Sequence, residues 1–495
     1  MVNNTITDDD IVRILYVYNP WWQQKPIPHS RLKSFKRHEH ARLAEQIKSE
    51  SIMAIIGARR VGKTTLLYQI IDMLLGQQCK TDPASILFVS MDDPYLFMSQ
   101  ENFEKMLNVY ITRILKKDGL DSLAAGQRVY IILDEIQGLE NWQSILKRWF
   151  DIRYDVKFII TGSSSAGILD SSSESLTGRI TYNAIYPMSF AEFTEFKRQD
   201  KLAKPLKKIV KKMPMILQNA AKAKDIRVLY DELVLAKNKI LPYENIVKTM
   251  LDEYIIKGGY PENMHIDDVT ICAGNLSTYL NLTIYKDAMR IRGARDPASL
   301  ESLFTIIAKE SSSVFSRTNV SKTLGISRSA TLNPYLTVLR DTYMISEAPF
   351  YSKSVTKSTR KESKMYVNDV GIRNATCSML DFQSLTDATE TGKMAETVAA
   401  DHTRRMMGQT GMHGGRARVS YWHEGYEVDM VAELPQAAIP IEVKYRENVS
   451  MSDLKGLKRF EKRFGAPIMI AITRNQLELK NNIMLVPMWL YLLMC

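Results

Sequence analysis

Cysteine is scarce in this chain of 495 residues, which contains only Cys79, Cys272, Cys377 and Cys495. The four cysteines lie far apart and form no CxxC pair. This spacing argues against a structural zinc site and against a disulfide framework. It fits a reducing compartment, so we expect a cytoplasmic protein.

Long apolar runs are also missing. The most apolar stretches, residues 52–56, 129–133, 158–160 and 468–472, are short. A membrane-spanning helix needs roughly 20 apolar residues. The first residues, MVNNTITDDDIV, are acidic and contain no apolar core, which is unlike a secretory signal peptide. We therefore expect no membrane association.

What the chain does have is an ordinary globular composition with a surplus of positive charge. Hydrophobic residues make up 45% and charged residues 24%, and the formal net charge is +11. The length predicts about three or four domains. The basic surplus favours a polyanionic partner, either nucleic acid or an anionic membrane. A solvated basic surface without a partner is the alternative.

The pattern of residue types divides the chain into five parts. Residues 1–45 are polar with one aromatic motif, Asn19-Pro20-Trp21-Trp22, whose rings either pack on the next domain or stack on a base; packing is favoured. Residues 46–195 alternate between short apolar strands and helices, residues 196–296 read as a Lys-rich helical lid or linker, residues 297–370 as helix, turn, helix and basic hairpin, and residues 385–495 as a separate α/β unit. Buried strands alternating with helices predict an α/β fold with a parallel sheet for residues 46–195.

A phosphate-binding loop is predicted directly after the strand at residues 53–56. The motif GxxxxGK[ST] is matched by Gly57, Ala58, Arg59, Arg60, Val61, Gly62, Lys63 and Thr64, followed by Thr65. Such a loop points successive backbone N–H groups at the β-phosphate, at the positive end of the following helix. Lys63 is predicted to reach the β and γ oxygens, and the Thr64 hydroxyl to bind Mg²⁺.

Two acids end the next buried strand, Val129-Tyr130-Ile131-Ile132-Leu133-Asp134-Glu135. Asp134 is placed to hold Mg²⁺ through water, and Glu135 to polarise the attacking water as general base. Together with the upstream loop, this predicts ATP and Mg²⁺ as cofactors.

Polar residues follow two more segments of the same domain. Ser163, after the strand that ends in Thr161-Gly162, is a candidate sensor of the γ-phosphate; an ordinary Gly-Ser loop is the alternative. Arg179 is a candidate for stabilising transition-state charge, in its own site or toward a neighbouring subunit of a homo-oligomer. A solvated arginine is the alternative.

A second acidic site is predicted near the C-terminus. Asp429 ends a strand, and Glu442 and Lys444 share one face of a later strand. Glu396, on a preceding helix, can add a carboxylate. Such acids bind a hard divalent cation, and a nearby lysine can position water for phosphodiester cleavage. A surface strand with cross-strand ion pairs is the alternative.

In order along the chain, these motifs resemble archaeal and bacterial ATPases that join an AAA-type P-loop domain to a C-terminal DUF4143 region. The marks of the resemblance, which covers nearly the whole chain, are the Asn19–Trp22 motif, the P-loop, Leu133-Asp134-Glu135-Ile136-Gln137, Thr161-Gly162-Ser163-Ser164, Leu176-Thr177-Gly178-Arg179, Tyr186-Pro187-Met188-Ser189-Phe190-Ala191-Glu192-Phe193, Lys257-Gly258-Gly259-Tyr260-Pro261-Glu262, Tyr366-Val367-Asn368-Asp369-Val370-Gly371, Glu427-Val428-Asp429 and Ile441-Glu442-Val443-Lys444. The resemblance implies an AAA+-like core, a winged helix and a tail similar to PD-(D/E)xK restriction endonucleases. It also implies DNA as partner.

Three functions follow. In the first, ATP hydrolysis drives a DNA-processing enzyme whose tail cuts DNA with Glu396, Asp429, Glu442, Lys444 and a second divalent metal. In the second, the tail and the winged helix bind DNA without cutting. In the third, the ATPase is a switch that acts on a protein partner.

Overall fold

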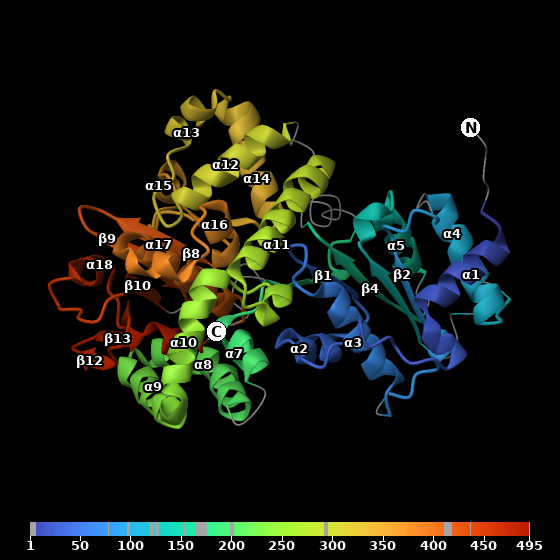
Figure 1. The fold of residues 1–495 in the computed structure, drawn as a ribbon, viewed down its shortest axis with the longest axis horizontal. Coiled ribbons are helices and arrows are strands. Elements are labelled where there is room, and N and C mark those ends of the chain that lie inside the picture. Colours follow the sequence, from blue (N-terminus) through green and yellow to red (C-terminus); the bar gives the residue numbers. More distant parts are fainter. Residues whose placement is uncertain are drawn as a thin grey trace. The chain divides into compact units, whose positions relative to one another are not determined.

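The computed structural model describes residues 6–77, 79–96, 100–118, 123, 128–152, 155–164, 176–198, 202–291, 296–409, 418–435 and 437–494. The chain forms two compact units, Met1–Tyr186 and Pro187–Cys495 (Figure 1). The finer division into five parts stays a prediction. The described helices include none that combines a membrane-spanning length with sufficient apolar character.

The first unit is a parallel sheet with helices on both faces (Figure 1). Its elements are α1 (Asp8–Tyr18), η1 (Pro20–Gln23), α2 (Glu39–Gln46), β1 (Ile52–Ile56), α3 (Lys63–Leu75), η2 (Pro83–Ser85), β2 (Ile86–Ser90), α4 (Gln100–Val109), η3 (Tyr110–Ile114), β3 (Val129–Asp134), η5 (Ile136–Gly138), α5 (Trp142–Asp151), β4 (Val156–Gly162) and β5 (Ile180–Ala184).

The strand order in this sheet is β2-β3-β4-β1-β5, and every neighbouring pair is parallel. All five residues of β1 are buried, as expected for a central strand covered on both faces. The predicted α/β class and parallel sheet are confirmed. The strand β5 was not predicted, because its sequence, ITYNA, is polar and only partly buried.

The aromatic motif near the N-terminus packs on the edge of this sheet. The indole Nε1 atoms of Trp21 and Trp22 both donate to the Ile86 carbonyl oxygen, at 3.1 and 2.9 Å. The Asn19 side chain bonds the backbone of Phe88 in both directions. Packing, rather than base stacking, is therefore the role of these rings.

The second unit contains a helical part and a C-terminal sheet. Its helices and strands are α7 (Phe190–Lys197), α8 (Ala203–Ala223), α9 (Ile226–Ile240), η6 (Leu241–Tyr243), α10 (Glu244–Lys257), η7 (Pro261–His265), α11 (Val269–Leu282), η8 (Thr283–Asp287), η9 (Ala288–Arg290), α12 (Pro297–Lys309), α13 (Arg317–Leu324), η10 (Arg328–Leu332), α14 (Asn333–Asp341), β6 (Ile345–Ala348), α15 (Val355–Arg360), β7 (Lys364–Val367), α16 (Val370–Thr376), η11 (Phe382–Thr386), α17 (Ala388–Gln409), β8 (Val419–His423), β9 (Glu427–Glu433), β10 (Ala438–Lys444), α18 (Lys455–Phe464), β11 (Met469–Thr473), β12 (Glu478–Lys480), β13 (Ile483–Pro487) and α19 (Met488–Leu492).

Helices α12, α13 and α14 precede an antiparallel pair, β6 and β7, in the order expected of a winged helix. The segment predicted as a basic hairpin tip differs from expectation, because it contains the short helix α15. The Ser354 hydroxyl caps this helix by accepting from the Lys357 N–H.

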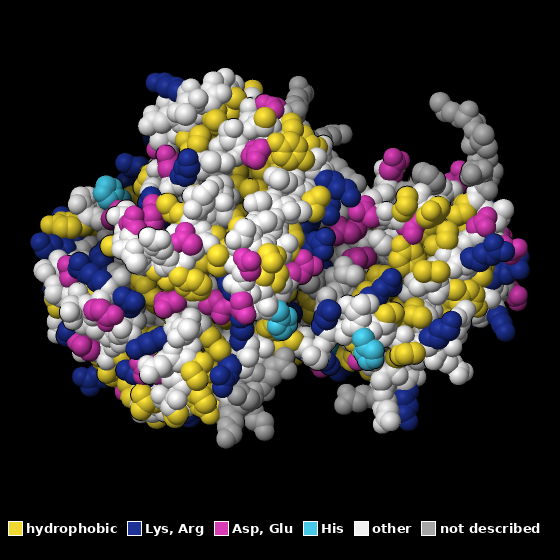
Figure 2. All heavy atoms as spheres, in the orientation of Figure 1, with side chains coloured by type: hydrophobic (Ala, Val, Ile, Leu, Met, Phe, Trp, Pro, Cys, Tyr) yellow, Lys and Arg dark blue, Asp and Glu magenta, His cyan; other side chains and the backbone are white. Residues whose placement is uncertain are grey.

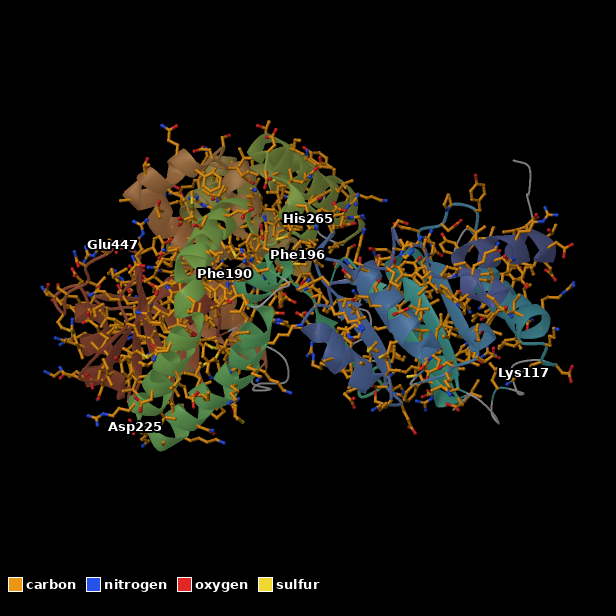
Figure 3. All side chains as sticks on the ribbon, turned by 60° about the horizontal axis from the view of Figure 1, so that its bottom comes forward. Lys117, Phe190, Phe196, Asp225, His265 and Glu447 are labelled. Atoms are coloured by element: carbon orange, nitrogen blue, oxygen red, sulfur yellow. The ribbon has the colours of Figure 1, made fainter. Side chains whose placement is uncertain are left out.

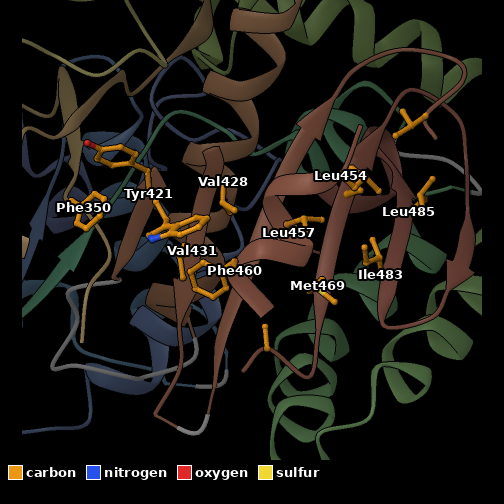
Figure 4. Close-up of a cluster of buried hydrophobic side chains, with 14 residues drawn as sticks. Phe350, Tyr421, Val428, Val431, Leu454, Leu457, Phe460, Met469, Ile483 and Leu485 are labelled. Carbon is orange, nitrogen blue, oxygen red and sulfur yellow. The ribbon is translucent and has the colours of Figure 1, made fainter. Parts of the chain in front are cut away.

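The C-terminal sheet has the order β12-β13-β11-β10-β9-β8 and mixes parallel with antiparallel pairs. One face packs on α18 through a buried apolar cluster that includes Trp422, Leu457 and Phe460 (Figure 4). The Trp422 and Phe460 ring centroids lie 5.6 Å apart, edge to face. This packing fixes β9 and β10, which hold the predicted acids.

The Tyr186–Phe193 motif acquires a structural role in the second unit. Ser189 and Glu192 form a capping box that begins α7. The first N–H of that helix, from Phe190 (Figure 3), donates to His402 Nε2 on α17 at 2.9 Å. Burial and the nearby Arg405 lower the pKa of His402 to about 4, which keeps its ring neutral and able to accept this bond.

Two other motifs of the resemblance, far apart in sequence, meet in this unit. The Gly259 N–H donates to Asp369 Oδ2 at 2.8 Å. A Cβ on Gly371 would lie 2.1 Å from the Lys257 carbonyl oxygen, so only glycine fits there. These motifs fasten the end of α10 to the start of α16.

Candidate nucleotide-binding site

The predicted phosphate-binding loop joins β1 to α3 as expected. Helix α3 begins at Lys63, and Gly62 adopts a left-handed conformation with φ +97° before it. A Cβ on Gly57 would lie 2.1 Å from the Ile185 carbonyl oxygen, so this position requires glycine. Ala58 and Val61 are buried, whereas Arg60 turns the loop with φ +63°.

The ammonium group of Lys63 lies inside the loop. It donates to the carbonyl oxygens of Gly57 and Ala58, both at 2.9 Å. The hydroxyl of the next residue, Thr64, donates to Asp134 Oδ2 at 2.7 Å. The loop lysine and the first acid of β3 therefore belong to one site.

Strand β4 completes this site because it lies between β1 and β3 in the sheet. The Thr161 hydroxyl donates to Asp134 Oδ1 at 2.5 Å and accepts from the Glu135 N–H at 2.9 Å. Ser163 Oγ accepts from Gln137 Nε2 at 3.1 Å, and the same amide also donates to Glu135 Oε2. Ser163 thus lies one side chain away from the predicted general base.

The two acids have opposite electrostatic environments. Burial raises the pKa of Asp134, against the hydrogen bonds from Thr161 and Thr64. Burial also acts to raise the pKa of Glu135, but Lys63, Gln137, Arg59 and Ser163 outweigh it and lower that pKa overall. Glu135 is therefore ionised at neutral pH, as a general base must be.

Thr64 and Asp134 fit a Mg²⁺ ion. Both offer oxygen, the hydroxyl and carboxylate lie within hydrogen-bond distance, and Mg²⁺ takes few protein ligands beside waters and phosphates. Thr65, the next residue, is half-buried in the first turn of α3.

Arg179 is not brought to this site. Its backbone carbonyl accepts from the Ile52 N–H, at the start of β1, whereas the phosphate loop follows the end of β1. Its side chain pairs with Asp151 at 2.8 Å. A role in its own site therefore conflicts with the sheet register, and a role toward a neighbouring subunit stays a prediction.

Comparison with known families agrees with this geometry. Residues 49–194 match the family described as "AAA domain", and residues 391–491 match "Domain of unknown function (DUF4143)". The chain joins an AAA domain to a DUF4143 domain. Residues 248–386 match a further family, "Domain of unknown function (DUF8612)", so the three-helix part and the β6–β7 pair lie outside the DUF4143 domain proper.

Three similar proteins carry the description "uncharacterized protein". One from Methanocaldococcus jannaschii is 27% identical over 64% of this chain and 60% of its own length. A second protein of that organism is 24% identical over 92% of this chain and 88% of its length, and one from Haemophilus influenzae is 22% identical over 66% and 69%. The chain thus spans less than two thirds of the first of these relatives.

Two solved structures are similar to this chain at low identity and low TM-score. Caenorhabditis elegans PCH-2 is 19% identical, with a TM-score of 0.20 over 32% of this chain and 43% of its own. A DNA polymerase III gamma subunit-related protein from Thermotoga maritima is 12% identical, with a TM-score of 0.24 over 61% and 97%.

The AAA domain supports binding and hydrolysis of ATP, and the structure adds a residue that the motifs did not indicate. Arg37 is buried and donates to the carbonyl oxygens of Val61, within the phosphate loop, and Tyr186, both at 3.0 Å. Arg37 therefore positions the loop from behind. Arg37 lies outside any short motif, so no signal in the sequence pointed to it.

The DUF4143 domain brings together Asp429, Glu442 and Lys444 on neighbouring antiparallel strands. Asp429 Oδ2 accepts from the Val443 N–H at 2.8 Å, and the Lys444 ammonium donates to Glu442 Oε1 at 2.5 Å. Burial and the nearby Asp429 raise the pKa of Glu396 to about 7 and that of Glu442 to about 8. All four predicted residues therefore belong to one cluster of charged side chains, the acidic cluster.

A second divalent metal at this acidic cluster is not supported. The part of the chain that the structure describes contains no group of three or more His, Cys, Asp or Glu side chains arranged to hold a metal ion. Instead, the ammonium of Lys364, from β7, lies 2.9 Å from Glu396 Oε1 and 3.4 Å from Asp429 Oδ1. The structure therefore gives no support for Glu396, Asp429 and Glu442 as metal ligands, because their carboxylates pair with Lys364 and Lys444 instead.

Proposed function

We propose that this protein is a Mg²⁺-dependent ATP hydrolase whose turnover is coupled to DNA binding by its second unit, without DNA cleavage. The observation that carries the proposal is that four side chains converge at the carboxyl ends of β1 and β3: Lys63, Thr64, Asp134 and Glu135.

In this proposal, Lys63 and the loop N–H groups hold the phosphate tail of ATP. Glu135, held by Gln137 and by Thr161, orients the attacking water and takes its proton. Thr64 and Asp134 hold Mg²⁺, which supplies positive charge at the phosphate oxygens. Ser163 is placed to sense the γ-phosphate through Gln137.

Exposed cations on α18 support DNA as partner. The apolar face of this helix packs on the sheet, and its other face carries Lys455, Lys458, Arg459, Lys462 and Arg463, all exposed. Figure 2 shows Lys and Arg side chains at the surface of the second unit, where α18 lies. Cations gathered on one helix face can neutralise backbone phosphates.

Helix α15 extends this basic surface. A pocket of about 470 Å³ is lined by Ser354, Thr356, Lys357, Arg360 and Lys361. Glu424 joins the two helices, because it accepts from Lys357 on α15 at 2.6 Å and pairs with Arg463 on α18. Hydroxyls and cations around one pocket are suited to phosphate.

Neutralising α18 tests the DNA proposal. We expect the triple variant Lys458→Gln, Arg459→Gln, Lys462→Gln to bind duplex DNA more weakly. The slope of log affinity against log salt should become shallower by about 2–3, since each lost phosphate contact contributes close to 0.9. Fluorescence anisotropy of labelled DNA at several salt concentrations measures this, and DNA-stimulated ATP turnover should fall in parallel.

The matched control is Lys208→Gln, Lys211→Gln, Lys212→Gln, which removes three lysines from α8, where all three are exposed. If both triple variants weaken binding equally, only net charge matters and the α18 surface is wrong. If the wild type binds no DNA at low salt, a protein partner replaces DNA in the proposal.

Cleavage is the second candidate function, favoured by the strand geometry of Asp429, Glu442 and Lys444. Because Lys364 pairs with Asp429 and Lys444 pairs with Glu442, we expect wild-type protein to leave supercoiled plasmid intact with Mg²⁺ or Mn²⁺, with or without ATP. Strand breaks that disappear in both Asp429→Ala and Lys444→Ala would instead establish the nuclease.

A further inference from the structure

The acidic cluster of the DUF4143 domain already contains a cation. The Lys364 side chain is almost fully buried, with 2% of its surface exposed, and its ammonium contacts three carboxylates. Glu427 Oε1 lies at 2.6 Å, Glu396 Oε1 at 2.9 Å and Asp429 Oδ1 at 3.4 Å. A lysine so surrounded is paired as completely as a buried charge requires.

This lysine comes from a different part of the chain than the acids. It begins β7, which pairs with β6 within the residues matched by DUF8612. Tyr366, two residues further on the same face, donates to Glu396 Oε1 at 2.8 Å. Strand β7 therefore contributes two hydrogen-bond donors to the acidic cluster, Lys364 and Tyr366.

The remaining carboxylate oxygens are mostly engaged as well. Asp429 Oδ2 accepts from a backbone N–H, and Glu442 Oε1 accepts from Lys444. Glu442 Oε2 is buried and has no hydrogen-bond partner. An orphaned buried oxygen of this kind costs free energy.

We propose that Lys364 is the resident cation of this cluster and excludes divalent metal, so that removing its ammonium lets a hard divalent cation bind at the carboxylates it contacts, Glu396, Glu427 and Asp429. Truncating one member of a buried charge group leaves the others uncompensated. A dication restores the balance through the oxygen ligands it prefers. The proposal depends on neither ATP hydrolysis nor DNA binding.

Mn²⁺ binding to the full-length, nucleotide-free protein tests the proposal. Electron paramagnetic resonance counts the bound ions, and thermal unfolding reports the stabilisation that accompanies binding. We expect Lys364→Met to bind one Mn²⁺ per chain more than the wild type, and Lys364→Met/Asp429→Asn to lose that ion. Lys364→Arg, which keeps the positive charge, should bind no more than the wild type.

The outcomes separate cleanly. The proposal is overturned if the wild type binds a Mn²⁺ ion that Asp429→Asn abolishes, or if folded Lys364→Met gains none. Lys364→Gln, whose amide still donates to Glu396, decides the same question if the methionine variant fails to fold. Folding of Lys364→Met only when Mn²⁺ is present would support the proposal, because the ion then replaces the ammonium.

Discussion

Lys63→Ala is expected to abolish ATP turnover and to weaken ATP binding by about 10–100-fold, the equivalent of one charge-assisted hydrogen bond of roughly 1.5–3 kcal/mol. The Lys63 side chain is buried at the start of α3, where its ammonium group faces the interior of the loop. Its two hydrogen bonds in the loop go to the main-chain carbonyl oxygens of Gly57 and Ala58.

Isothermal titration calorimetry with ATP and a phosphate-release assay measure the two effects. Lys48→Ala is the matched control, since this lysine belongs to the same unit and its side chain is 74% exposed. Lys63→Ala with normal binding and turnover would remove the phosphate-loop assignment. A loss shared by Lys48→Ala would indicate a general effect of lysine removal.

Glu135→Gln should bind ATP but turn it over about 10²–10⁴-fold more slowly, the usual contribution of a general base. The amide has nearly the same shape as the carboxylate, but it cannot accept the proton of the attacking water. The backbone N–H of residue 135 would still donate to Thr161, so the strand end should keep its geometry. Binding should persist, because the groups that hold phosphate and Mg²⁺ are unchanged.

Stopped-flow binding of a fluorescent ATP analogue and single-turnover hydrolysis separate binding from chemistry. Glu140→Gln is the control, because Glu140 is an exposed acid shortly after the same strand. Turnover by Glu135→Gln at the wild-type rate would exclude this residue as the base. Loss of ATP binding would instead give it a structural role.

The acidic cluster in the DUF4143 domain shows why local sequence can mislead about the members of a site. The sequence predicts the grouping of Asp429, Glu442 and Lys444, because they lie on two apolar strands that are close together along the chain. Lys364 is not predictable in this way, because it lies 65 residues from Asp429 in the sequence and reaches the cluster from β7, which pairs with β6. Its sequence neighbours, in a basic segment, predicted an exposed wing.

Local pattern by itself determined the phosphate loop, the acids after β3 and most strands of the first unit. These features depend on neighbouring residues alone: an apolar run, a glycine turn and a helix start, each with its own conformational preference. The strands predicted at residues 53–56 and 129–135 correspond to β1 and β3, each within one residue.

Tertiary structure alone decided what those features meet. The insertion of β4 between β1 and β3 places Thr161 on Asp134, and the register of β5 moves Arg179 to the far end of the sheet. Arg37 supports the phosphate loop and Lys364 joins the acidic cluster, although neither residue belongs to a recognised motif. Strand order and the partners of buried charges arise from packing over long sequence separations, which no window of neighbouring residues encodes.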